Sequence, residues 1–263
     1  MTPAALDSRP SPPDTLARRI FLGARGLRAG WRLLLFYLVT FAATLPFLGY
    51  ATTKLGVGEN RPFTFGLLLF AEAVYLGATL AALAVMGRIE NRRFADWRAP
   101  LAPLSAVFGG RFWEGAGWGI GFTATIAAVL ASVGAYRVAG VASGSGVARA
   151  AGLWLLGALL IGVYEELSFR GYQLTTLADG VGWWPAAVLM SLYFGFVLHY
   201  LEKPDETLLD GVNVSLVALF LAESVRRTGT IWFAAGCHFA FNFVALFVLG
   251  SPNTAFGGAI EPH

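Results

Sequence analysis

Long apolar runs separated by short polar stretches are the dominant pattern of this chain. A helix that crosses a bilayer needs about 20 apolar residues, since each adds ~1.5 Å across a hydrocarbon core roughly 30 Å thick. The run 211–225 is the shortest candidate, so six to eight spans fit the pattern. The sequence therefore predicts an all-α, polytopic transmembrane helical bundle of about seven spans. These are residues 31–50, 63–86, 117–139, 148–177, 183–201, 211–225 and 230–249.

The polar stretches at the two ends divide the chain into three parts. We expect residues 1–30 to form a cytoplasmic N-terminal tail and residues 251–263 a short C-terminal tail. We expect residues 31–250 between them to form one transmembrane domain, because one such domain accounts for the whole length. The stretch 108–118 fits either an interfacial helix or the beginning of the span that follows.

Composition supports a membrane protein and excludes some partners. The chain is 56% hydrophobic and only 13% charged, whereas a soluble domain carries about 25% charged residues. Its net charge of +3 is modest and no basic tract is present, so we expect the lipid bilayer and no nucleic acid as partner. Cys237 is the only cysteine, so no internal disulfide can form. Oligomeric state is not encoded in any recognisable pattern.

Basic residues in short loops predict the orientation, because such loops stay in the cytoplasm. Five arginines precede the first span and four follow the second, which indicates a multi-pass protein of the plasma (inner) membrane with a cytoplasmic N-terminus. On this topology Glu165 and His238 fall in the cytoplasmic half of the bilayer. His199, late in its span, falls toward the outer half. The prediction thus contains a conflict, since residues of one site must share one depth.

A charged cluster follows the apolar run 153–163. Charged groups at membrane depth are costly and usually functional. Glu166 and Arg170 are four residues apart, with the acid first, which favours an ion pair. Glu165 lies about 100° further around the helix, so it can face a cavity and act as a general base on water. The competing interpretation is a structural ion-pair network, but two acids and one base leave a carboxylate unmatched.

Two later spans carry His199 and the pair His238/Asn242. His238 and Asn242 are also four residues apart and share a helix face, so both can donate hydrogen bonds to an oxyanion. His199 can orient a water molecule or transfer a proton. For the pair, the alternative is interhelical hydrogen bonding, which is common in membranes. For His199 the alternative is an ordinary interfacial histidine.

Three motifs together resemble the CAAX-protease and bacteriocin-processing (CPBP) family of intramembrane peptidases, which includes the type II CAAX prenyl endopeptidases. They are Glu165-Glu166-x-x-x-Arg170, a histidine after a Phe-rich helix, and His238-x-x-x-Asn242, within residues 110–250. The resemblance implies an endopeptidase that hydrolyses a peptide bond of a membrane-associated or lipid-modified protein or peptide.

The resemblance also implies roles for the motif residues. Glu165 would be the catalytic base, His199 the residue that positions water, and His238 with Asn242 the oxyanion donors. Glu166 and Arg170 would support them.

One departure concerns the second motif, Phe-x-x-x-His in the family. Gly195 stands four residues before His199, and phenylalanines flank that glycine. Of the two, Phe196 precedes the histidine by three residues and lies on its face of an α-helix.

We expect no metal or other cofactor, because the chain has no His-Glu-x-x-His and asparagine is a poor zinc ligand. Zinc held by Glu165, His199 and His238 is the alternative, since two histidines and a glutamate form a common catalytic set. Two other functions stay open. One is a non-catalytic membrane scaffold or immunity protein of the same fold. The other is a proton-coupled transporter that uses Glu72 and the Glu165 cluster.

Overall fold

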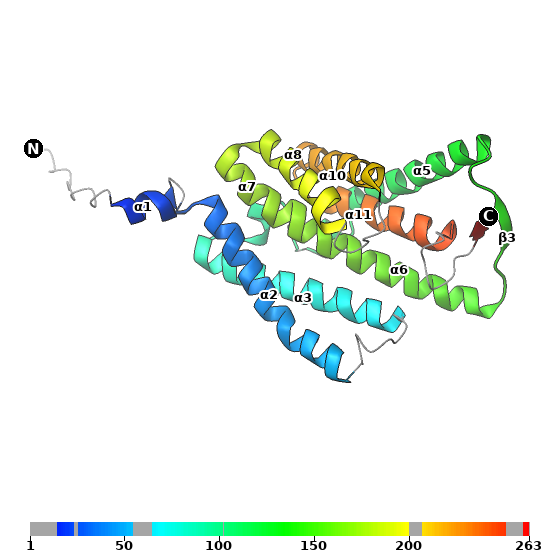
Figure 1. The fold of residues 1–263 in the computed structure, drawn as a ribbon, viewed down its shortest axis with the longest axis horizontal. Coiled ribbons are helices and arrows are strands. Elements are labelled where there is room, and N and C mark those ends of the chain that lie inside the picture. The colour runs from blue at the N-terminus through cyan, green and yellow to red at the C-terminus, as the bar shows by residue number, and fades with distance from the viewer. Residues whose placement is uncertain are drawn as a thin grey trace, which may run out of the picture.

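The computed structural model describes residues 15–23, 26–54, 65–101, 103–199, 207–250 and 260–262, and these are mostly helical (Figure 1). The predicted tails fall largely outside them, including residues 1–14 and His263. The helices are α1 (Leu16–Phe21), α2 (Ala29–Lys54), α3 (Phe65–Glu90), α4 (Leu104–Val107), α5 (Gly110–Ser132), α6 (Ser145–Glu165), α7 (Leu174–Val181), α8 (Trp183–Tyr193), α10 (Leu208–Thr228) and α11 (Trp232–Asn242). A 3-10 helix, η1 (Phe94–Trp97), and three π-helical segments, η2 (Glu166–Gln173), η3 (Phe194–Leu198) and η4 (Phe243–Val248), complete them.

The prediction of an all-α membrane bundle is confirmed. Within the described residues, five helices are long and apolar enough to cross a membrane: Ala29–Thr52, Phe65–Glu90, Leu104–Ser132, Gly146–Val181 and Leu208–Thr228. Two shorter apolar helices, Trp183–Leu198 and Trp232–Val248, coincide with the remaining predicted spans. The shortest predicted span, 211–225, lies inside α10, which extends beyond it at both ends.

The third predicted span, 117–139, was misplaced. Helix α5 begins at Gly110, so most of the stretch 108–118 belongs to the span. The helix ends at Ser132 because Gly134 takes a left-handed conformation with φ of +75°, which glycine tolerates and a continuing helix does not. The chain then forms the short strand β3 (Val138–Val141), which pairs antiparallel with β4 (Ile260–Pro262).

Helix α11 is held at its centre by direct backbone contact with two neighbours. A Cβ on Gly115 of α5 would lie 2.0 Å from the Phe233 carbonyl oxygen, and one on Gly236 would lie 1.9 Å from that of Phe112. On the α6 side, a Cβ on Gly162 would lie 2.9 Å from the Phe239 nitrogen. Small residues let membrane helices approach this closely. The helix that carries His238 is therefore fixed from both sides.

Helices α6, η2 and α7 run as one continuous rod through the bundle, with α2 and α3 on one side and α8, α10 and α11 on the other (Figure 1). A buried ionic cluster joins α2, α3 and α7 at one end. Arg32 donates to Glu90 at 2.7 Å and to Asp179 at 3.2 Å, and Arg92 donates to Asp179 at 2.7 Å. The hydroxyl of Tyr172 donates to Glu90 at 2.6 Å, which connects the cluster to η2.

A sharp turn at Gly182, with φ of +86°, reverses the chain between α7 and α8. The two rods on either side of this turn are antiparallel neighbours. Positions equally distant from Gly182 along the two rods therefore lie at similar heights. This turn decides which polar residues of the two rods can meet.

Candidate active site

The two adjacent glutamates lie where the α-helix changes to a π-helix. Glu165 is the last residue of α6, and Glu166 opens η2, whose eight residues are all buried. The Glu166 side chain is 0% exposed and that of Glu165 is 15% exposed. Single π-turns within α-helices are rare and often mark functional sites.

Glu166 binds two partners through one oxygen. Arg170 donates to Glu166 Oε1 at 3.0 Å, so the ion pair predicted from the i,i+4 spacing is present. His238 Nδ1 lies 3.1 Å from the same oxygen. Glu166 Oε2 is buried and has no hydrogen-bond partner among the described residues. The carboxylate therefore orients the imidazole of a helix 72 positions away in sequence.

The other imidazole nitrogen faces the second glutamate. His238 Nε2 lies 3.7 Å from Glu165 Oε2, which is too long for a direct hydrogen bond. One water molecule or one substrate oxygen can contact both groups at that separation. Both side chains are partly exposed, so neither is completely enclosed by the bundle.

Asn242 is the last residue of α11, one turn beyond His238 on the same helix face. Helix packing thus places its amide on the side of α11 that also carries the imidazole. Cys237, next to His238, is buried and not disulfide-bonded, as expected of a packing residue.

The depth conflict of His199 is removed by the turn at Gly182. Residue 182 is 17 positions after Glu165 and 17 positions before His199, and 12 positions separate it from both Arg170 and Phe194. The antiparallel rods therefore bring His199 to the height of Glu165. The predicted spans concealed this because they ended the fourth helix at residue 177, whereas α7 continues to Val181.

His199 reaches the glutamate cluster through a phenylalanine. The ring centres of His199 and Phe194 are 5.7 Å apart. The Arg170 guanidinium lies over the Phe194 ring, 4.5 Å from its centre. Phe169 packs edge-on against Phe194 at 5.1 Å. The sequence placed Phe196 on the histidine's face of an α-helix, and the structure shows a ring contact of His199 with Phe194. The α-helical spacing used for that prediction does not apply, because residues 194–198 are π-helical.

The residues do not support the three-ligand zinc alternative. Within the described part of the chain, no group of three His, Cys, Asp or Glu side chains is arranged to hold a metal ion. Both nitrogens of His238 face carboxylates, and the recorded ring contact of His199 is with an aromatic side chain. The cluster is instead suited to holding a water molecule beside a carboxylate.

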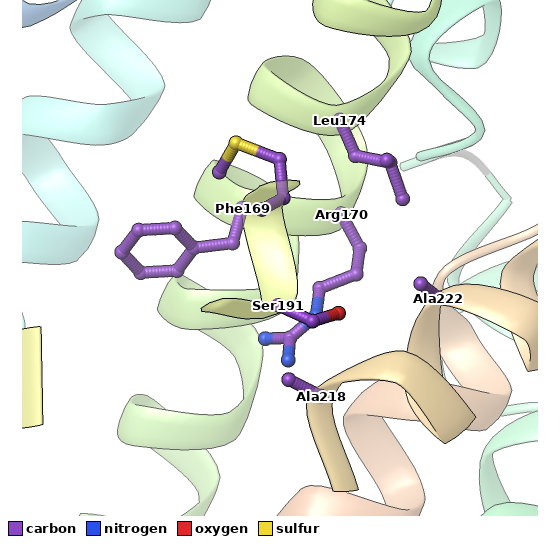
Figure 2. A pocket seen from close by; sticks show the side chains of 7 residues that line it. Phe169, Arg170, Leu174, Ser191, Ala218 and Ala222 are labelled. Atoms are coloured by element: carbon purple, nitrogen blue, oxygen red, sulfur yellow. The ribbon is translucent and has the colours of Figure 1, made fainter. Parts of the chain in front are cut away.

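A small cavity of about 10 Å³ lies beside Arg170, between η2, α8 and α10. Figure 2 shows the Arg170 guanidinium and the Ser191 side chain at this cavity, with Ala218 and Ala222 opposite. A cavity of this volume holds at most about one water molecule. The cavity is therefore too small for a peptide and belongs to the packing that surrounds Arg170.

Residues 147–244 match the family model described as type II CAAX prenyl endopeptidase Rce1-like. The resemblance predicted from the three motifs is thereby confirmed for this part of the chain. The matched segment contains every candidate site residue, whereas α2, α3 and α5 precede it. No curated protein and no solved structure gives a significant match.

Proposed function

We propose that this chain, an integral membrane protein with an Rce1-like domain of the type II CAAX prenyl endopeptidases, is an intramembrane endopeptidase in which Glu165 activates water. The substrate would be a membrane-associated or lipid-modified protein or peptide. The arginines suggest a cytoplasmic N-terminus. That orientation would place Glu165 and His238 in the cytoplasmic half of the bilayer, which such a substrate would enter from the cytoplasm.

One observation carries this proposal: His238 lies between the two glutamates, with one ring nitrogen toward each. Glu166 holds Nδ1, which fixes the orientation of the ring. The second nitrogen then points toward the partly exposed Glu165 carboxylate, where water and a peptide carbonyl would meet. An ion-pair network with only a structural role would not need a partly exposed carboxylate beside a fixed imidazole.

The reaction follows from these positions. Glu165 takes a proton from water, whose oxygen attacks the carbonyl carbon of the scissile peptide. The tetrahedral oxyanion accepts hydrogen bonds from the Asn242 amide and from His238 Nε2–H when the ring carries both protons. His199 holds the attacking water. When the C–N bond breaks, the proton passes from Glu165 to the leaving amine, which yields a carboxylic acid and an amine.

Hydrolysis by the purified protein tests the role of Glu165. In lipid nanodiscs, the wild type should cleave a farnesylated peptide that ends in a Cys-a-a-X sequence, with products identified by mass spectrometry. Glu165→Gln keeps the shape but removes the base, so we expect kcat to fall by at least about 100-fold. The same assay in the presence of a metal chelator should give an unchanged rate.

Glu114→Gln is the matched control, because Glu114 is an exposed partner of Arg111 on α5. Its rate should equal that of the wild type. Turnover by Glu165→Gln at the wild-type rate would contradict the proposed chemistry. Loss of activity with the chelator would favour the zinc alternative.

A further inference from the structure

The segment before His199 is wound so that residues five apart share a face. Residues Phe194–Leu198 form a π-helix with i→i+5 hydrogen bonds. In an α-helix, a residue five positions back lies about 140° around the axis, so Phe194 would point away from His199. The π-turn brings it back, and the two rings are 5.7 Å apart.

Packing against α10 explains why the aromatic stands at position 194. A Cβ on Gly195 would lie 2.2 Å from Ser215 Oγ, 2.4 Å from the Gly211 carbonyl oxygen and 2.9 Å from the Ser215 nitrogen. Two of these atoms belong to the backbone of α10 and cannot move aside. The position four residues before the histidine must therefore be glycine here, and an aromatic side chain has no room there.

Phe194 also covers the charged cluster. Its ring lies 4.5 Å from the Arg170 guanidinium and 5.1 Å from the Phe169 ring, and the side chain is buried. A cation over an aromatic face is attracted more strongly where water is excluded. One ring thus contacts both His199 and the arginine that pairs with Glu166.

We propose that Phe194 is the positioning residue that sets His199 and Arg170 relative to each other, and that the π-turn at residues 194–198 exists to place it there. This inference rests on the proposed function of the same site. Phe194 acts through its two neighbours and does not itself touch the reacting atoms.

The activity test compares three variants in the nanodisc assay. Phe194→Leu keeps apolar volume but removes the ring, so we expect kcat to fall by about tenfold or more, since small misplacements of catalytic groups are costly. KM should stay within about twofold, because substrate binding is not altered. Phe194→Tyr restores the ring and should recover at least about a third of the wild-type kcat. Val197→Ala is the control on the same turn, because the Val197 side chain is exposed, and it should stay within about twofold of wild type.

A spectroscopic test does not depend on turnover. The chain has three histidines, so their ring signals in a ¹³C-histidine-labelled sample can be assigned with His199→Gln. Because an adjacent aromatic ring shifts the resonances of its neighbour, Phe194→Leu should move the His199 signal. Val197→Ala should leave that signal in place.

The outcomes separate this inference from the proposed function. If Phe194→Leu is as active as wild type while Glu165→Gln is inactive, the positioning role is wrong and the protease assignment stands. An unmoved His199 signal in Phe194→Leu also overturns the inference, even if the wild type cleaves none of the peptides. Equal losses in Phe194→Leu and Val197→Ala would indicate general packing and contradict a specific role for Phe194.

Discussion

At the scale of single residues, Glu166 determines the geometry of the cluster. It is fully buried, and one of its oxygens binds both Arg170 and His238. Burying a charge is tolerated only when it is paired and hydrogen-bonded. The neighbouring Glu165 keeps partial exposure, so two adjacent carboxylates differ in accessibility and in the role that each can take.

Removing the charge of Arg170 should expose this dependence. Arg170→Gln leaves the buried carboxylate with His238 alone, and we expect a loss of about 3–5 kcal/mol in stability, as for other broken buried pairs. Thermal unfolding in detergent micelles measures it. Arg111→Gln, in the exposed pair with Glu114, should cost at most about 1 kcal/mol. Equal losses of stability in the two variants would show that the buried pair contributes no more to stability than the exposed pair.

At the scale of helices, close backbone contact between α5 and α11 places His238. The glycines of α5 differ sharply in their surroundings. A Cβ on Gly115 would meet the Phe233 carbonyl oxygen at 2.0 Å, whereas nothing lies within 4 Å of one on Gly117. The first position faces α11 and the second faces outward. Two residues in one helix thus provide a test with its own control.

Gly115→Ala should separate the two helices. Overpacking of this kind costs about 1–3 kcal/mol, and the shift of α11 should also reduce turnover because His238 moves with it. Gly117→Ala should be neutral or slightly stabilising, since alanine is a better helix former by about 1 kcal/mol. The melting temperature and kcat of both variants report these effects. A harmless Gly115→Ala would contradict the close contact.

At the scale of the whole molecule, the ionic cluster of Arg32, Glu90, Arg92 and Asp179 joins α2 and α3 to the rod that carries the glutamates. Its connection to η2 is the hydrogen bond from Tyr172 to Glu90. Helices α2 and α3 precede the segment that matches the family model. They nevertheless contact the site-bearing rod directly, so the domain and its N-terminal helices behave as one packed unit.

We expect Arg32→Gln to loosen this unit. Arg32 is almost fully buried and bonds to carboxylates from two other elements, so its loss should lower the unfolding free energy by roughly 3 kcal/mol. Turnover should decrease as well, through Tyr172 and η2. Arg88→Gln is the control, because Arg88 is exposed and donates to a carbonyl of its own helix. An unchanged melting temperature in Arg32→Gln would refute the proposed coupling.

The sequence by itself determined the relations that lie within one helix. Apolar run lengths set the spans, because bilayer thickness imposes a minimum length. The i,i+4 spacing predicted the Glu166–Arg170 pair and put His238 and Asn242 on one face, since helix geometry is local. The motif order was sufficient to recognise the family. None of these inferences required knowing how the helices pack.

Only the tertiary structure decided the relations between helices. The turn at Gly182 brought His199 to the depth of Glu165. The lengths of the apolar runs could not indicate this, because helices α6 and α7 extend beyond the apolar stretch. Backbone packing placed His238 between two glutamates. The π-turn brought the Phe194 ring to His199, which the sequence did not indicate because residues five apart lie on different faces of an α-helix. Such features depend on contacts between segments far apart in sequence, and local propensities do not encode them.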